Sequence, residues 1–174
     1  SIREILANLA AGELGKTSFE RLVQAAFSSE KHRDEFGAVL AEWDSSLGIK
    51  ETNQILRGYF LFVTGALAEA REVLQGCKKH PWGAYHLART VEGLGLAEDA
   101  AKIARDAAGK HADHIELQLL AAELGARTAD TEGARKFLEG VRKTIGTGAD
   151  FLFVEGFVLE REGEYADAIE RSRE

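Results

Sequence analysis

Apolar side chains recur every three or four positions along most of this chain, the spacing that places them on one face of an α-helix. Two such segments follow one another between residues 81 and 112. The first carries Tyr85, Leu87, Ala88, Val91 and Leu94, and the second carries Ala100, Ile103, Ala104 and Ala107. A glycine-containing turn separates the two segments. The pattern therefore predicts an antiparallel pair of helices.

Small residues recur at a fixed spacing in the rest of the chain. In the first helices they lie 34 positions apart, at Ala88, Ala122 and Gly156. In the second helices they lie at Ala100, Ala134 and Ala168. A small side chain at the same place in each helix is what a close approach of two backbones requires. The recurrence therefore predicts a stacked array of helix pairs.

An earlier unit begins near Glu51 and has Gly58, Gly65 and Ala70 in the equivalent positions, 30 rather than 34 residues before the next unit. We expect four units, at about residues 51–80, 81–114, 115–148 and 149–174, in an array over residues 49–174. In the last unit the first helix has Leu152, Phe153 and Leu159 as its apolar residues. Its second helix is cut at Glu174, so we expect a longer parent protein.

Residues 1–48 are expected to form a separate segment of three helices packed on the first end of the array. Their apolar positions have helical spacing but lack the small-residue pattern. Thr17 and Glu20 have the spacing of a capping box, in which the hydroxyl accepts an amide hydrogen bond and the carboxylate reaches back. Ser29 is expected to cap the next helix. The whole chain is therefore predicted to be all-α.

Composition and charge argue against some classes of protein, among them nucleic-acid-binding and membrane-spanning proteins. The chain has 174 residues, of which 45% are hydrophobic, and its formal net charge is −7. Lysine and arginine are spread among acidic residues, which argues against a direct nucleic-acid-binding face. No apolar run approaches the roughly 20 residues of a membrane span. The single cysteine, Cys77, excludes a disulfide within the chain and is typical of a reducing compartment, so we expect a cytoplasmic protein.

The 34-residue period and the small residues represented by Ala88 and Ala100 resemble those of tetratricopeptide repeats (TPRs). The resemblance implies a TPR-like α-solenoid of antiparallel helix pairs that follows an N-terminal helical segment. It also implies a non-enzymatic scaffold without a cofactor or metal. Its concave groove would bind a peptide or helix segment, either of another protein or of the same chain.

In TPR proteins the first helices of successive units line this groove, and their positions can be carried over one by one. The implied groove residues are Tyr59, Phe62, Tyr85, Arg89, Glu92, Leu119, Glu123, Arg127, Phe153, Phe157 and Arg161, with Ile55, Val63 and Glu160 beside them. Any single aromatic residue among them is equally well explained as ordinary core. As a set they predict a groove with an aromatic side and a side of interleaved arginines and glutamates.

The charges in this set bear on the expected ligand. Arginines alternate with Glu92, Glu123 and Glu160, so neighbouring charges are expected to neutralise one another when no ligand is bound. An amphipathic segment is then a better ligand than a purely anionic one. Some TPR modules clamp a peptide carboxylate with lysine and asparagine, but this chain has Tyr85 and Phe157 nearby instead, so the clamp is not supported.

The order of elements also resembles planctomycete-type bacterial proteins in which a TPR array accompanies a domain like the C-terminal domain of the RNA polymerase α chain. This resemblance rests on the helical leader that ends near Trp43, on residues 56–70 and on the short junction to residues 86–88. It implies an alternative function, a regulatory array in a larger transcription-related protein. No polymerase-like domain is present in these residues, so that domain would lie beyond Glu174.

Two short motifs match patterns that carry chemistry in other proteins. Residues 10–17 match a relaxed phosphate-binding loop, but such a loop follows a strand, whereas the residues before it have helical spacing. His111, Asp113 and His114 bring together two imidazoles and a carboxylate, but a metal site needs three or four converging ligands. We interpret the first motif as the ends of two helices and the second as a polar loop, and we expect no catalytic residues.

Residues 10–17 are accordingly predicted not to bind nucleotide. A calorimetric titration with Mg-ATP should show no saturable heat, because the strand that positions a phosphate-binding loop is missing. Micromolar binding that disappears in Lys16→Ala would contradict this interpretation.

Overall fold

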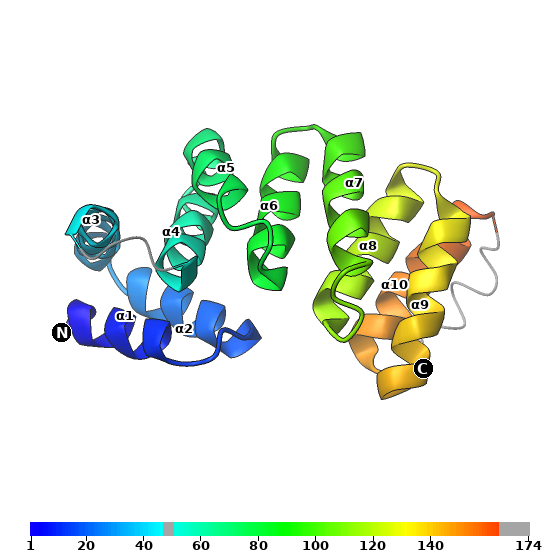
Figure 1. Cartoon of the computed structure of the whole chain (residues 1–174), viewed down its shortest axis with the longest axis horizontal. Coiled ribbons are helices and arrows are strands. Elements are labelled where there is room, and N and C mark those ends of the chain that lie inside the picture. The colour runs from blue at the N-terminus through cyan, green and yellow to red at the C-terminus, as the bar shows by residue number, and fades with distance from the viewer. Residues whose placement is uncertain (47–50, 164–174) are drawn as a thin grey trace. The chain divides into compact units, whose positions relative to one another are not determined.

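The computed structural model describes residues 1–46 and 51–163, apart from the side chains of residues 43–46. These residues form ten α-helices and no strand, which confirms the all-α prediction (Figure 1). The helices are α1 (Ile2–Ala11), α2 (Lys16–Ala26), α3 (Glu30–Ser46), α4 (Glu51–Val63), α5 (Leu67–Gln75), α6 (Pro81–Gly93), α7 (Ala97–Ala108), α8 (Ile115–Arg127), α9 (Thr131–Ile145) and α10 (Ala149–Arg161). The chain has two compact units, Ser1–Thr90 and Val91–Glu174, with the boundary inside α6.

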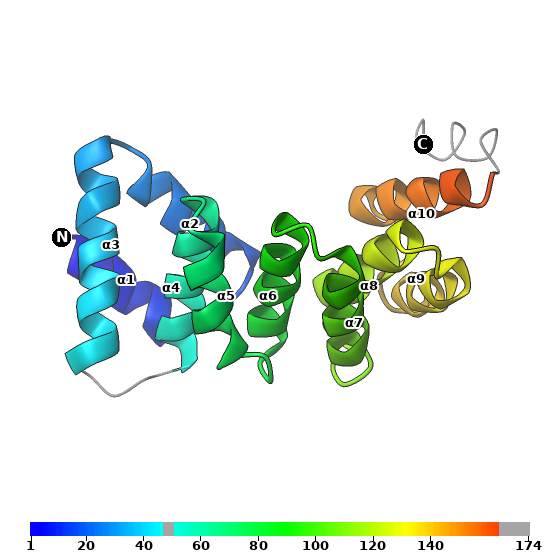
Figure 2. The same cartoon turned by 90° about the horizontal axis from the view of Figure 1, so that it is seen from above.

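The first unit joins the N-terminal helices to the pair α4–α5. Helix α3 contacts α1, α2 and α4, and α4 packs against α5 (Figures 1 and 2). Their common core is built from large side chains with almost no exposed area, namely Leu6, Leu22, Phe36, Ile55 and Leu56. The three N-terminal helices therefore share one hydrophobic core with α4, the first helix of the first repeat pair. The expected domain boundary at residue 48 stays a prediction.

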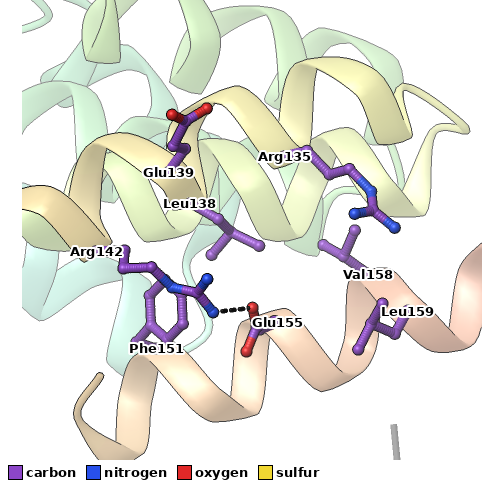
Figure 3. A pocket seen from close by; sticks show the side chains of 8 residues that line it. All are labelled: Arg135, Leu138, Glu139, Arg142, Phe151, Glu155, Val158 and Leu159. Carbon is purple, nitrogen blue, oxygen red and sulfur yellow. Dashed lines mark hydrogen bonds and ion pairs between the residues drawn. The ribbon is translucent and has the colours of Figure 1, made fainter. Parts of the chain in front are cut away.

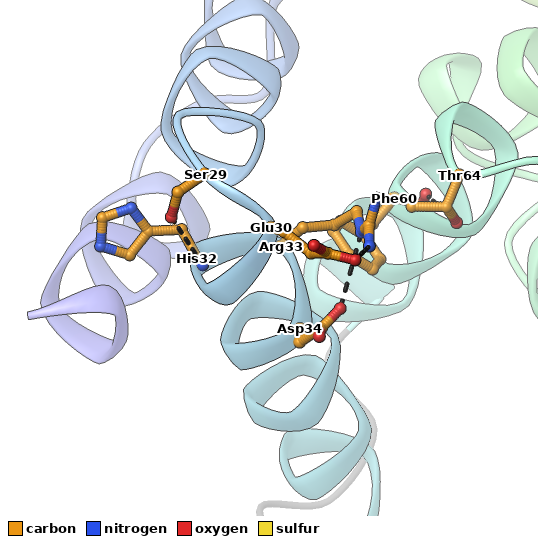
Figure 4. A network of polar contacts seen from close by, with 7 residues as sticks. All are labelled: Ser29, Glu30, His32, Arg33, Asp34, Phe60 and Thr64. Atoms are coloured by element: carbon orange, nitrogen blue, oxygen red, sulfur yellow. Dashed lines mark hydrogen bonds and ion pairs between the residues drawn. The ribbon is translucent and has the colours of Figure 1, made fainter.

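The caps of the N-terminal helices differ in one case from the expectation. Helix α2 begins at Lys16 rather than after Thr17, and the Gly15 amide donates a 3.3 Å hydrogen bond to Ser18 Oγ. The predicted Thr17–Glu20 capping box is therefore wrong by two positions. Ser29 does cap α3, since its Oγ accepts a 3.1 Å bond from the His32 amide (Figure 4). Such a cap satisfies an amide that has no partner within the helix.

The turn that ends each first helix has the same backbone geometry. One residue in each turn adopts a positive φ: Gly65 at +85°, Gly95 at +80°, Ala129 at +64° and Gly163 at +82°. In the first three turns the following amide donates to a carbonyl five residues earlier, at 2.8–3.2 Å, as a helix C-terminal cap requires. These four residues follow the 30- and 34-residue spacing of the sequence. The backbone therefore repeats with the predicted period.

The small residues lie where helices approach closely. A Cβ atom added to Gly58 on α4 would be 2.4 Å from Leu74 Cγ on α5, closer than two carbon atoms approach. Ala100 and Ala134 have 0% and 1% of their surface exposed. The predicted role of these positions is therefore supported within the described residues, and the fourth second-helix position, Ala168, lies outside them.

The short junction between α5 and α6 also depends on a glycine. Helix α5 ends at Gln75, so Cys77 lies in the following turn rather than in the helix, and its side chain is fully buried. A Cβ added to Gly83 near the start of α6 would be 2.1 Å from the Cys77 carbonyl oxygen. Pro81 occupies the first position of α6, where its missing amide proton costs no helix hydrogen bond.

Helix α8 is the centre of the second unit. It contacts α7, α9 and α10, and every residue from Leu117 to Ala126 is buried. The buried amide of Gln118 donates to the Ala108 carbonyl at 2.7 Å and to the His111 carbonyl at 3.0 Å. These bonds offset the cost of burying a polar side chain. The unit is therefore built around one nearly enclosed helix.

Helix α10 buries one part of its apolar surface and exposes another. Phe151, Val154 and Val158 are 1–5% exposed and belong to the core, whereas Phe153 is 70% exposed. Of the apolar residues named from the sequence, Leu152 and Leu159 are half-buried and Phe153 is exposed. Helix α10 is apolar on more than one side, so its sequence does not determine which side faces the core.

The turn geometry gives a prediction for stability. A non-glycine residue at positive φ is strained, so Ala129→Gly should raise the free energy of unfolding by about 1 kcal/mol. The matched opposite change, Gly95→Ala, should lower it by a similar amount. Both can be measured by urea denaturation, and a destabilised Ala129→Gly variant would contradict the proposed strain.

Candidate partner-binding faces

The residues expected to line a groove are divided between the two units. Four of them, Tyr59, Phe62, Tyr85 and Arg89, belong to the first unit. The other seven, Glu92, Leu119, Glu123, Arg127, Phe153, Phe157 and Arg161, belong to the second. The two sets have different surroundings.

In the first unit the aromatic residues form a cluster around Phe19 of α2. The Phe19 ring centroid lies 4.9 Å from that of Tyr59 on α4, and 5.0 Å and 4.3 Å from those of Trp82 and His86 on α6. Tyr85 packs edge-on against Trp82 at 5.4 Å. Phe19 itself is only 4% exposed. The chain's own α2 therefore contacts Tyr59, which the sequence assigned to the groove, and two α6 side chains, Trp82 and His86, which it did not.

Other expected groove residues of this unit extend the same cluster. Phe62 stacks on Tyr59 at 6.4 Å, and the Arg89 guanidinium lies 5.9 Å from the Tyr85 ring centroid. Ile55, placed beside the groove by the resemblance, is fully buried and is a core residue. The sequence does not identify Phe19 as a neighbour of these residues. The helical spacing of Phe19 is explained by the core face of α2, and the residues around it do not indicate which distant helix it contacts.

His86 lies in the middle of this cluster. It is 4% exposed, and its Nε2 has no hydrogen-bond partner in the described part of the chain. Burial, and to a smaller extent the positive charge of Arg89, lowers the pKa of His86 to about 3. The imidazole is therefore neutral in the folded protein and serves as a packing group.

In the second unit a charged network joins three helices. The Arg127 guanidinium on α8 pairs with Glu92 at the end of α6 at 3.0 Å, and with Glu123, one turn earlier on α8, at 2.8 Å. The Glu123 side chain is 9% exposed and that of Glu92 21% exposed, whereas that of Arg127 is 45% exposed. The expected neutralisation of arginine by Glu92 and Glu123 is therefore present, and Glu160 takes no part in these ion pairs.

The ring of Phe157 on α10 connects this network to a second arginine. The Arg127 guanidinium lies 5.4 Å from the ring centroid, and the Arg161 guanidinium lies 5.3 Å from it. A cation over an aromatic ring contributes about 0.5–1 kcal/mol at an exposed site. Phe153, one turn before Phe157, is exposed. Leu119 is 8% exposed and belongs mainly to the core.

A pocket of about 300 Å³ lies elsewhere in the second unit, between α9 and α10. Its lining is both apolar and charged: Arg135, Leu138, Glu139, Arg142, Phe151, Glu155, Val158 and Leu159. Arg142 lies over the Phe151 ring and pairs with Glu155 at 2.7 Å (Figure 3). Arg135 holds Glu162 through both of its carboxylate oxygens. These bonds tie α10 to α9.

The two motifs that match patterns of chemical function, residues 10–17 and 111–114, lie at helix ends. Residues 10–17 span the end of α1, a connection and the start of α2, so a helix precedes them as predicted. His114 caps α8, with its Nδ1 accepting a 3.2 Å bond from the Leu117 amide. Within the described residues no group of three metal-ligating side chains converges. The helices of this part of the chain also include none that is long and apolar enough to cross a membrane.

The surroundings of His86 predict a pH dependence of stability. The unfolded chain binds a proton on this residue below its ordinary pKa of 6.5, whereas the folded chain does not until about pH 3. Stability should therefore fall as the pH decreases through this window, with His86 contributing at most about 1.4 kcal/mol per pH unit.

Urea denaturation from pH 7 to pH 4 measures this effect. His86→Phe should reduce the pH dependence of the unfolding free energy, whereas the same change at the exposed His32 should not. Equal pH dependence in wild type and His86→Phe would show that the imidazole is not buried in its neutral form.

Comparisons with known proteins agree with this architecture. No protein-family model and no curated protein matches the chain. A tetratricopeptide repeat protein from Parabacteroides merdae ATCC 43184 is similar over 89% of this chain, with a TM-score of 0.69 and 14% identity. The chain spans 64% of that protein, just under two thirds of its length.

Two structures of MamA are also similar. A double mutant of MamA (RS-1) has a TM-score of 0.67 and 14% identity over 91% of this chain and 92% of its own. MamA (MSR-1) has a TM-score of 0.63 and 11% identity over 88% of this chain and 90% of its own. The repeated turns, the small-residue positions and these likenesses together show that the chain has a tetratricopeptide-repeat-type fold.

Proposed function

We propose that this protein is a non-enzymatic interaction scaffold and that the exposed side of α10 in its second unit, together with Arg127 at the end of α8, binds a protein or peptide segment; we call this surface the α8–α10 face. Solenoids of this type use extended surfaces of stacked first helices for binding. The observation that carries the proposal is the network in which Arg127 joins Glu92, Glu123 and Phe157. It fixes the side chains of three helices on one face before any partner arrives.

The exposed aromatic residue next to this network supports the assignment. Phe153 is 70% exposed, whereas its apolar neighbours on α10, Phe151 and Val154, are buried. Aromatic and arginine side chains supply a large share of the binding energy at protein interfaces. Helix α10 carries aromatic and arginine side chains within a few turns, at Phe153, Phe157 and Arg161.

The first unit differs because its aromatic groove residues already have a partner in the chain. Phe19 packs directly on Tyr59, and also on Trp82 and His86, which in turn contact Tyr85. Helix α2 thus covers part of the surface that the sequence assigned to a ligand. We propose that α2 is an intramolecular occupant of this part of the surface. Binding of a second protein is then assigned to the second unit. The alternative, a regulatory array in a transcription-related protein, stays a prediction that no described residue favours.

Selection of partner peptides tests this function. Random peptides displayed on phage would be selected on the immobilised full chain, and the affinities of synthetic copies measured by fluorescence anisotropy. Phe153→Ala and Phe157→Ala should each weaken binding by about 1 kcal/mol or more, roughly five-fold in Kd. Lys102→Ala, an exposed change on α7, should leave the affinity unchanged.

The thermal midpoint of each variant shows whether it remains folded. Phe153 is the more informative position because its side chain is largely exposed, so its replacement should have little effect on folding. Peptides whose affinity is insensitive to both phenylalanines but reduced by Lys102→Ala would show that the binding face has been assigned to the wrong helices.

A further inference from the structure

We propose that the α8–α10 face selects segments that carry a carboxylate and an apolar side chain, with the carboxylate bound by Arg161 and the apolar side chain by Phe153. This inference rests on the proposed function and names the chemistry of its partner.

Arg127 is unsuited to bind a further anion. Two glutamates already contact its guanidinium, Glu92 at 3.0 Å and Glu123 at 2.8 Å. Their two negative charges exceed its single positive charge, so the surroundings of Arg127 repel an incoming carboxylate. Displacing Glu123 would remove the Arg127 ion pair from a carboxylate that is only 9% exposed, which is costly. The structural role of Arg127 is therefore to hold α8 against α6 and α10.

Arg161 has different surroundings. Its side chain is exposed, and no carboxylate in the described part of the chain forms an ion pair with it. Of the two acidic neighbours in sequence, Glu162 is held by Arg135 on α9. Glu160 directly precedes Arg161, and adjacent residues on a helix point in different directions. The Phe157 ring supports the Arg161 guanidinium from one side and leaves its hydrogen-bond donors available.

The helix geometry sets the spacing of the two contacts. Phe153 and Arg161 are eight residues apart on α10, which corresponds to about 12 Å along the axis and about 80° around it. A helical partner would therefore carry an apolar residue and an acidic residue seven or eight positions apart. An extended partner would span the same distance in about four residues.

The peptides selected on the full chain test this chemistry directly. We expect aspartate or glutamate to be enriched at that spacing from an apolar residue. Arg161→Glu should weaken binding of a selected synthetic peptide at least five-fold, and replacing the peptide's acidic residue with lysine should restore binding to this variant. Lys102→Glu makes the same change of charge at an exposed position on α7 and should have little effect.

The outcomes separate the inference from the function on which it rests. Selected peptides that need Phe153 and Phe157 but bind Arg161→Glu as they bind wild type, or that are basic, would overturn the inference and leave the binding face intact. A selection that yields no peptide sensitive to either phenylalanine would overturn both. If Arg161→Glu lowers the thermal midpoint, Arg161→Gln replaces it, because this change removes the charge without reversing it. Arg161→Gln should then also weaken peptide binding at least five-fold.

Discussion

The close approach of paired helices is the constraint on which the rest of this structure depends. Gly58 has no room for a side chain beside Leu74, and Ala100 and Ala134 are almost completely buried. Packing at this density means that a larger side chain would force the helices apart, typically at a cost of about 1–3 kcal/mol. The positive-φ turns at Gly65, Gly95 and Ala129 then return the chain at the angle that this packing needs.

This packing has a consequence for polar groups. Because α8 is buried along most of its length, Gln118 and Glu123 reside where unpaired polar atoms are costly. Gln118 donates to two carbonyl groups before the start of α8, and Glu123 pairs with Arg127. The charged network on the α8–α10 face is therefore partly a product of the fold. Neither Phe153 nor Arg161 is needed to pair a buried polar group. For that reason we assign the recognition of a partner to these two residues.

The sequence predicts the features of this fold that depend on local chemistry. The repeat period follows from small residues such as Ala88 and Ala122, because a backbone contact excludes larger ones. The pairing of Arg127 with Glu123 follows from their four-residue spacing on a helix. The contact between Phe19 and His86 is not predictable in this way, because residues far apart in sequence meet there and any large apolar side chain would satisfy the helical pattern.

The buried face of α10 could not be predicted for a related reason. Apolar side chains occur all around this helix, because Leu152 and Leu159 lie on the side opposite to Phe153 and Phe157, and Phe151, Val154 and Val158 lie between. The choice between Phe151 and Phe153 as the core residue is then decided by α8 and α9, against which α10 packs. The face left exposed by that choice is the one we propose for binding. A site of this kind is defined by tertiary packing rather than by a motif.

Hydrogen exchange of the full chain with and without a selected peptide is the most direct test of this account. Bound peptide should slow amide exchange in α10 and at the end of α8. Exchange in α2 and α4 should stay the same, because Phe19 already packs on Tyr59 there. Slowed exchange in α4 and the start of α6, accompanied by faster exchange in α2, would contradict it. That result would mean that the ligand displaces α2 and binds the first unit.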